Sequence, residues 1–336
     1  MDMRKRNLLL VFTGGTIASV QTENGLRPVL DAEEMLKYLP EIPGDICLSS
    51  VQICNIDSTN MTYREWLKIA AAIEENYQKY DGFVICHGTD TMAYTAAALS
   101  YLIQNSIKPI VLTGAQEPIQ QEITDAKKNL MDSIHYAADP ESCGVQIVFN
   151  GKAIAGTRAK KTKSSSYSAF SSINFPEIAT IRHGKIIRYL TRQIKGEVTF
   201  YHQMNPRVFA WKMTPGVTSE VLLPILHAYD AVIIESFGVG GIPSSLVDDL
   251  LSFMKTDEAK DKILIMTTQV TYEGSHMSTY EVGKRMEDYF PFLEGFDMTF
   301  EAVLAKTMWL LGQDGMNPEK FREQFYQKIE YDILWN

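Results

Sequence analysis

The sequence has few cysteines, and their spacing does not suggest a disulfide framework. Its four cysteines, Cys47, Cys54, Cys86 and Cys143, form no CxxC pair, and Cys86 lies inside the apolar run GFVICHG. Free thiols in a reducing compartment are typical of this pattern. The six histidines never fall at the spacing of metal ligands, so we expect no structural or catalytic metal.

Long apolar runs are also missing. No stretch approaches the roughly 18 apolar residues of a transmembrane helix, so we expect no membrane association. The N-terminal MDMRKRNLLLVF places three basic residues before a short apolar run. That run is shorter than the roughly 7–15 residues of a signal-peptide core, and no small-residue cleavage site follows it. We interpret it as the buried first strand of a cytoplasmic protein.

A concentrated basic surface is absent as well. Lys and Arg number 32 against 41 Asp and Glu, which gives a net charge of −9 without long runs of like charge. Nucleic acids and anionic membranes bind surfaces of concentrated positive charge, so neither is an expected partner. The one local basic cluster is RAKKTK, residues 158–163.

What the chain does have is an alternation of short apolar runs and amphipathic segments. Asp31 with Glu34, and Thr62 with Glu65, each predict a capping box at the start of a helix. Runs such as GFVIC, PIVLTG and GVQIVFN are apolar throughout, which favours strands of a parallel sheet covered by helices on both faces.

The length of 336 residues and the 45% hydrophobic content predict two domains. We expect an α/β fold with a large N-terminal domain, a mostly parallel sheet with helices on both faces, over residues 1–192. The pattern loosens between about 171 and 206, and we place a linker at 193–211. A smaller C-terminal α/β domain is expected over residues 212–336.

Four predicted strands end in small hydroxyl and glycine residues. The segments are FTGGT, NIDSTNMT, CHGTDTM and LTGAQEP. Ligands of open α/β sheets bind just beyond the carboxyl ends of the strands. TGGTIAS satisfies neither the phosphate-loop pattern nor the dinucleotide pattern, which argues against a nucleotide site.

The remaining interpretation is a threonine nucleophile. A threonine hydroxyl attacks a carbonyl only when a base takes its proton and donors stabilise the oxyanion. HGTDT supplies Thr89 and Asp90 at a strand end, and RAKKTK could supply a lysine. The alternative is that Thr13 and Thr16 only cap a turn, Asp90 caps a helix and the lysines lie in a solvated loop.

TGGTIAS (residues 13–19) and HGTDTMAYTAAALSYL (residues 87–102) resemble the two signature segments of the L-asparaginase family, most of all its bacterial type I, cytoplasmic form. The similarity continues through PIVLTGAQEP, GVGGIP and MTFEAVLAKTMWLLG. It implies a cofactor-free amidohydrolase that converts L-asparagine to L-aspartate and ammonia through a threonine acyl-enzyme. It also implies a homodimer or homotetramer with active sites between subunits.

The resemblance also implies roles for individual residues. Thr16 matches the family nucleophile, while Thr89, Asp90 and Lys161 match a Thr–Lys–Asp relay, with Lys160 as the competing alignment of the lysine. The expected substrate contacts comprise the relay residues Thr89 and Asp90 together with positions at the four strand ends. These further positions are Gly15, Asp57, Ser58, Thr59, Gly88 and Ala115.

One departure from the family concerns the loop TENGLRPV, which has Leu26 where the family carries a lid tyrosine. Tyr38 and Tyr63 both lie in predicted helices and are not obvious replacements. Two alternatives to an asparaginase therefore stay open. One is a glutaminase or another amidase on the same scaffold, and the other is a protein that binds asparagine or aspartate with weakened catalysis.

Overall fold

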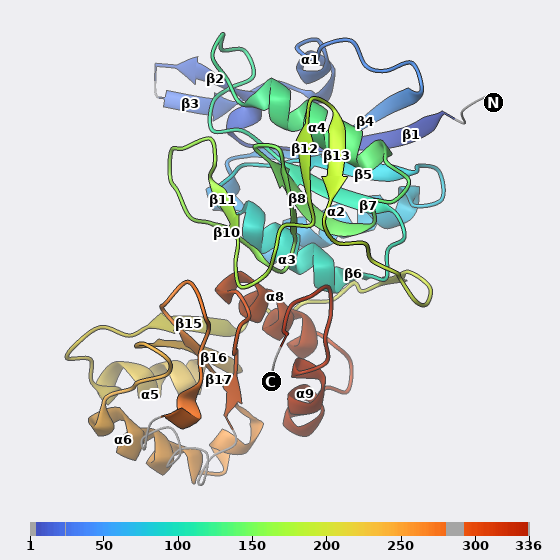
Figure 1. Ribbon diagram of the computed structural model, residues 1–336. Helices are drawn as coiled ribbons and strands as arrows, with labels where there is room; N and C mark the ends of the chain where they lie inside the picture. Colours follow the sequence, from blue (N-terminus) through green and yellow to red (C-terminus); the bar gives the residue numbers. More distant parts are fainter. Residues whose placement is uncertain (1–4, 24, 280–291, 335–336) are drawn as a thin grey trace. The chain divides into compact units, whose positions relative to one another are not determined.

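The protein folds into two α/β units. The structure, a computed structural model, describes residues 5–23, 25–279 and 292–334. Unit 1 comprises residues 1–202 and unit 2 residues 203–336 (Figure 1). The predicted fold class, a mostly parallel sheet domain followed by a smaller α/β domain, is confirmed. The division between the units lies within residues 193–211, whose bounds as a linker stay a prediction.

Unit 1 is built on an eight-stranded sheet with the order β13-β12-β9-β8-β7-β5-β1-β4. Its strands are β1 (Arg6–Gly14), β4 (Ile46–Ile56), β5 (Gly82–Cys86), β7 (Pro109–Thr113), β8 (Gly144–Phe149), β9 (Lys152–Ala155), β12 (Ala179–Arg182) and β13 (Lys185–Arg188). The five strands from β8 to β4 pair in parallel, and the other three are antiparallel. Because helices cover both faces, β5, β7 and β8 are buried throughout.

Two helices of unit 1 begin at the capping boxes that the sequence predicts. The helices of this unit are α1 (Ala32–Leu36), α2 (Tyr63–Asn76), α3 (Met92–Leu102) and α4 (Ala126–Ala138). Asp31 and Glu34 form the reciprocal box of α1, and Thr62 and Glu65 that of α2. Tyr63 is the first residue of α2, whereas the helix predicted around Tyr38 ends before it. Figure 1 shows α4 on one side of the sheet and α3 on the other.

Short hairpins in unit 1 were not predicted from the sequence. They are formed by β2 (Ser19–Thr22) with β3 (Gly25–Pro28), by β10 (Ala159–Lys161) with β11 (Phe170–Ser172), and by β12 with β13; β6 (Ile103–Gln104) also pairs with β14 (Thr199–Phe200). Between β12 and β13, His183 (φ 51°) and Gly184 (φ 71°) both have positive φ. Two consecutive residues of this kind form the tight turn that suits a two-residue hairpin.

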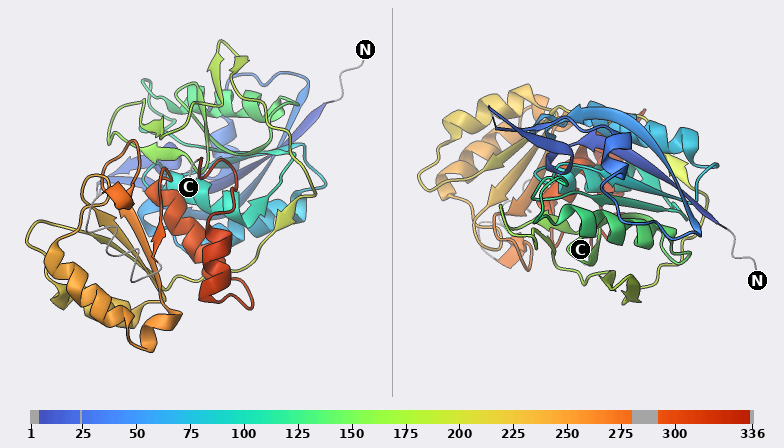
Figure 2. Two further views of the ribbon diagram at one scale, coloured as in Figure 1. Left: turned by 60° about the horizontal axis from the view of Figure 1, so that its bottom comes forward. Right: turned by 90° about the horizontal axis from the view of Figure 1, so that it is seen from above.

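Unit 2 contains a four-stranded parallel sheet with the order β15-β16-β17-β18. Its elements are β15 (Val208–Lys212), α5 (Ser219–Ala228), β16 (Ala231–Ser236), α6 (Ser244–Met254), β17 (Ile263–Thr268), β18 (Leu293–Glu294), α8 (Phe300–Leu311) and α9 (Pro318–Phe325). In Figures 1 and 2, α5 and α6 (yellow to orange) cover one face of this sheet, and α8 and α9 (red) lie on its other side.

Four short 3-10 helices complete the description: η1 (Thr16–Ala18), η2 (Ser58–Asn60), η3 (Glu258–Asp261) and η4 (Met277–Thr279). Within the described ranges, no helix is long and apolar enough to cross a bilayer.

A buried ion pair holds α8 to the C-terminal segment of unit 2. Lys306 and Asp332 are both fully buried, and their Nζ and Oδ2 atoms are 2.6 Å apart. Lys306 also donates to the carbonyl of Gln327 at 2.7 Å, and Asp332 accepts from the backbone N–H of Ile329 at 2.9 Å. Burial lowers the pKa of Lys306, while the charge of Asp332 acts in the opposite direction.

Replacing Lys306 by Met removes the ammonium that pairs with the buried Asp332 carboxylate. We therefore expect Lys306→Met to lose about 3–5 kcal/mol of unfolding free energy in urea titrations. The double variant Lys306→Met/Asp332→Asn should lose less, because asparagine removes the buried charge and still accepts from Ile329. A Lys306→Met stability within about 1 kcal/mol of wild type would contradict this account.

Candidate active site

The candidate site lies where four neighbouring strands of unit 1 end. The strands β7, β5, β1 and β4 are adjacent in this order, and each is parallel to the next. Their carboxyl ends therefore meet at one edge of the sheet. The four segments that the sequence analysis selected are the loops that follow these strands.

The loops after β1 and β5 are in direct backbone contact. A Cβ atom added to Gly15 would lie 2.4 Å from the Cα atom of Gly88, and Gly15 has a φ of 81°. A Cβ atom added to Gly88 would lie 2.6 Å from the Oγ atom of Ser58. Only glycine fits at these two positions. The contact places against each other the two backbone segments that continue into Thr16 and Thr89.

The two threonines of the first segment have different surroundings. Thr13 is buried, and its hydroxyl donates to the carbonyl of Cys86 at 2.9 Å, so it joins β1 to β5. Thr16 is half-buried and begins η1, where Gly15 provides no side-chain cap. Among the described residues, none hydrogen-bonds the Thr16 hydroxyl. The Thr16 hydroxyl therefore does not cap this turn.

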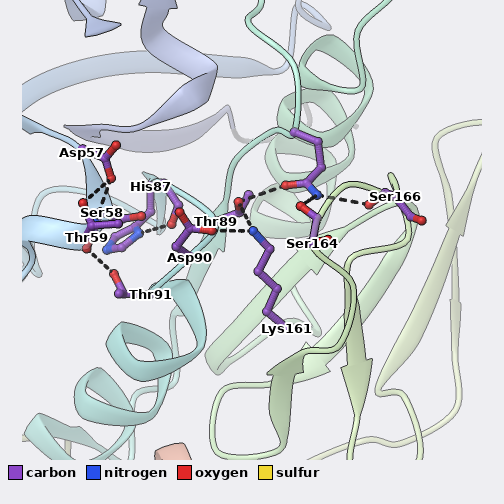
Figure 3. Close-up of polar contacts among 12 residues, drawn as sticks. Asp57, Ser58, Thr59, His87, Thr89, Asp90, Thr91, Lys161, Ser164 and Ser166 are labelled. Atoms are coloured by element: carbon purple, nitrogen blue, oxygen red, sulfur yellow. Dashed lines mark hydrogen bonds and ion pairs between the residues drawn. The ribbon is translucent and has the colours of Figure 1, made fainter. Parts of the chain in front are cut away.

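Lys161 contacts two polar residues of the HGTDT segment, Thr89 and Asp90 (Figure 3). Its Nζ atom lies 2.8 Å from the Oγ1 atom of Thr89 and 2.6 Å from the Oδ1 atom of Asp90. The lysine side chain is 15% exposed and that of Asp90 57%, so solvent screens the carboxylate more than the ammonium. Lys160, the competing alignment, precedes it on β10, where successive side chains point to opposite faces.

The predicted substrate residues after β4 form a compact turn beside this contact. Asp57 caps η2 by accepting from the backbone N–H and the hydroxyl of Thr59, each at 2.9 Å. The carbonyl of Ser58 accepts from the hydroxyl of Thr91 at 2.8 Å, which joins this turn to the loop after β5 (Figure 3). Ala115, in the loop after β7, is fully buried.

Sequence reasoning missed Gln116, which contacts the predicted relay. The hydroxyl of Thr89 donates to the Oε1 atom of Gln116 at 3.0 Å. The backbone N–H of Gln116 donates to the buried carboxylate of Asp125, at 3.0 Å to Oδ1. Burial raises the pKa of Asp125, although the hydrogen bonds that its carboxylate accepts act to lower it. The sequence signal for Gln116 was a polar residue directly after Thr113-Gly114-Ala115, where β7 ends.

The sequence also did not indicate a role for His87, the fully buried first residue of the HGTDT segment. Its Nδ1 atom lies 2.7 Å from the carbonyl oxygen of Gly88, which can only accept, so Nδ1 carries the proton. The Nε2 atom then accepts from Thr95 at 2.9 Å, and the indole N–H of Trp66 donates to the same hydroxyl at 2.9 Å. Burial lowers the pKa of His87 to about 4.

The sequence matches the family description "Asparaginase, N-terminal" over residues 7–195 and "Glutaminase/Asparaginase C-terminal domain" over residues 207–325. These matches span more than half of the chain. The chain belongs to the asparaginase family. The protein is therefore an amidohydrolase of that family.

Individual asparaginases are similar to this chain over nearly its whole length. The L-asparaginase of Thermococcus kodakarensis is 39% identical over 307 residues, which cover 91% of this chain and 92% of that protein. L-asparaginase 1 of Escherichia coli K12 is 31% identical, covering 98% and 99%. The solved structure of the thermostable Thermococcus kodakarensis enzyme has a TM-score of 0.91 at 36% identity, covering 98% of this chain and 100% of that chain.

The buried imidazole of His87 predicts a pH-dependent stability of this asparaginase-family protein. Its folded pKa of about 4 lies below the ordinary histidine value of 6.5, so the unfolded chain binds more protons between these two pH values. Stability should fall as the pH falls through this window, by up to about 3 kcal/mol from this residue. Urea unfolding of wild type and His87→Gln across the window measures the contribution. Identical pH slopes of the two proteins would contradict it.

Proposed function

We propose that the protein hydrolyses the side-chain amide of L-asparagine to L-aspartate and ammonia, through an acyl-enzyme on Thr16. The observation that carries this proposal is the contact of Lys161 with Thr89 and Asp90. These two residues lie in the loop after β5, whose backbone touches the loop after β1 that contains Thr16. Family membership supplies the reaction class, and the similarity to L-asparaginases supplies the substrate.

In the first half-reaction, the Thr16 oxygen bonds to the carbon of the substrate amide. The C–N bond breaks, and the amide nitrogen leaves as ammonia after taking the proton of the Thr16 hydroxyl. Because this hydroxyl is not committed to any described residue, its lone pairs and its proton are available to a bound substrate.

In the second half-reaction, water attacks the Thr16 ester and releases aspartate. Thr89 is placed to pass the proton of that water to Lys161 in its amine form, because their Oγ1 and Nζ atoms are 2.8 Å apart. Asp90 then stabilises the ammonium that forms, at 2.6 Å. The proton finally returns to the Thr16 oxygen as the ester bond breaks.

The substrate contacts are part of the same proposal. The turn of Asp57, Ser58 and Thr59 is proposed to hold the α-carboxylate, and Asp90 to bind the α-ammonium. Gly15, Gly88 and Ala115 complete the lining, where backbone groups come close to the substrate. No cofactor takes part. We further propose a cytoplasmic homodimer or homotetramer, as the type I resemblance implies.

A glutaminase is the second candidate, favoured by the C-terminal match, whose description joins glutaminase to asparaginase. One additional methylene changes binding by only about 1–3 kcal/mol, so the scaffold alone does not discriminate strongly. The ratio of kcat/KM for asparagine to that for glutamine decides between the two. A ratio above one supports the asparaginase, and a ratio below one supports the glutaminase.

Thr16→Ala should lower ammonia release from asparagine by at least about 10³-fold, because the variant lacks the nucleophile. Its unfolding free energy should stay within about 0.5 kcal/mol of wild type, since no described residue hydrogen-bonds the hydroxyl. Thr16→Ser, which keeps a hydroxyl, serves as the matched control and should retain measurable turnover. Full activity of Thr16→Ala would exclude Thr16 as the nucleophile.

Leu26 motivates a separate prediction about the loop of β2 and β3. Leu26 pairs with Gln21 across this hairpin, and its side chain lies outside the described part of the structure. A tyrosine there would add the hydroxyl that the family places near its nucleophile. We expect Leu26→Tyr to raise kcat/KM for asparagine, up to the roughly 10²-fold typical of a positioned proton donor. Leu26→Phe, the control without a hydroxyl, should not; equal effects would refute the idea.

A binding protein with weakened catalysis is the remaining alternative. It would bind asparagine in calorimetry without releasing ammonia. The contact of Lys161 with Thr89 argues against it, because a protein that only binds its ligand does not require a proton relay.

A further inference from the structure

Gln116 connects the predicted relay to the loop between β10 and β11. We call residues 162–169 the β10–β11 loop; it follows directly after Lys161. The Nε2 atom of Gln116 donates to the carbonyl of Ser164 at 2.9 Å and to that of Ser166 at 3.4 Å. Its Oε1 atom accepts from the Thr89 hydroxyl at 3.0 Å. One side chain therefore reaches both the relay and the loop. Figure 3 shows its partners Thr89, Ser164 and Ser166.

The directions of these hydrogen bonds follow from the chemistry of the groups. The carbonyls of Ser164 and Ser166 only accept, so the nitrogen of the Gln116 amide must face them. The Lys161 ammonium only donates, so it occupies a lone pair of the Thr89 hydroxyl. While Lys161 is an ammonium, the single proton of that hydroxyl is directed to the Gln116 oxygen; in the second half-reaction the Lys161 amine accepts it instead. Each partner fixes the orientation of the next.

The backbone of Gln116 is itself held firmly. The Asp125 carboxylate accepts from the N–H groups of Gln116 and Glu117, at 3.0 and 3.1 Å to Oδ1. Asn129 on α4 donates to the same carboxylate at 3.0 Å, and its Oδ1 accepts from the N–H of Asn150 at 2.9 Å. None of these contacts uses the side chain of Gln116, so a change of that side chain leaves them in place.

We propose that Gln116 is a positioning residue for the hydrolysis described above, and this inference rests on that proposed function. Its oxygen sets the rotamer of the Thr89 hydroxyl relative to Lys161, and its nitrogen holds the β10–β11 loop against the relay. A displacement of about 1 Å in a reacting group costs on the order of 10²-fold in rate. The effect should therefore appear in kcat, because Gln116 acts on the relay through Thr89.

Two variants of similar size separate the two halves of the amide. Gln116→Met removes the acceptor for Thr89 and the donor to the loop. Gln116→Glu keeps an acceptor for Thr89 and loses the donor. Gln120→Met is the matched control, because Gln120 lies in the same segment and, within the described part of the chain, its side chain donates only to the hydroxyl of Tyr38, at 3.1 Å on the surface.

Steady-state ammonia release and amide hydrogen exchange of the β10–β11 loop are measured for all four proteins. Gln116→Met should lower kcat by about tenfold or more, with KM changed by less than about threefold and an unfolding free energy near that of wild type. Both Gln116 variants should exchange faster than wild type in the β10–β11 loop. Gln116→Glu should recover most of the lost kcat, and Gln120→Met should match wild type in both measurements.

The inference is overturned if Gln116→Met turns over within about twofold of wild type, or if Gln116→Glu is no faster than Gln116→Met. It is also overturned if loop exchange is unchanged in both variants. These outcomes differ from a failure of the proposed function, in which wild type itself releases no ammonia from asparagine or glutamine.

Discussion

The contact between the backbones of Gly15 and Gly88 constrains the whole candidate site. These glycines follow β1 and β5, which are neighbouring parallel strands, so their loops leave the sheet side by side. A side chain on either glycine would force the loops apart, because the space is already filled by backbone or by Ser58. The relative position of the segments that carry Thr16 and Thr89 depends on this contact.

Each strand next to this contact adds one further part of the site. The end of β4 provides the turn of Asp57 and Ser58, and the end of β7 provides Gln116. Below the contact, the neutral imidazole of His87 supports the carbonyl of Gly88. Lys161 alone comes from outside this set of strands, on the short strand β10. The order β7-β5-β1-β4 thus brings these polar groups to one edge of the sheet.

Much of the fold could be predicted because its signals are local. The capping boxes at Asp31 and Thr62 involve residues three positions apart, and the buried strands are uniformly apolar. The hairpin of β12 and β13 was not predicted because its strands are short, although Gly184 in the His183-Gly184 turn is a residue typical of turns.

The site was harder to predict because its contacts are distant in the sequence. Thr89 and Gln116 are 27 positions apart, and Thr89 and Lys161 are 72 positions apart. No periodicity links such pairs. Lys161 was selected through the family resemblance, whereas Gln116 and His87 had no comparable guide. Their roles follow from the order of the strands, which the sequence pattern does not specify.

The central claim is that Thr16, and not Thr89, forms the acyl-enzyme. The distinction matters because Thr89 is the hydroxyl that contacts the lysine, and it could itself be considered a nucleophile. Acid quenching during turnover of asparagine, followed by mass spectrometry of the peptides, locates the aspartyl ester. Our account predicts the ester on the peptide that contains Thr16. An ester on the peptide that contains Thr89 would contradict it.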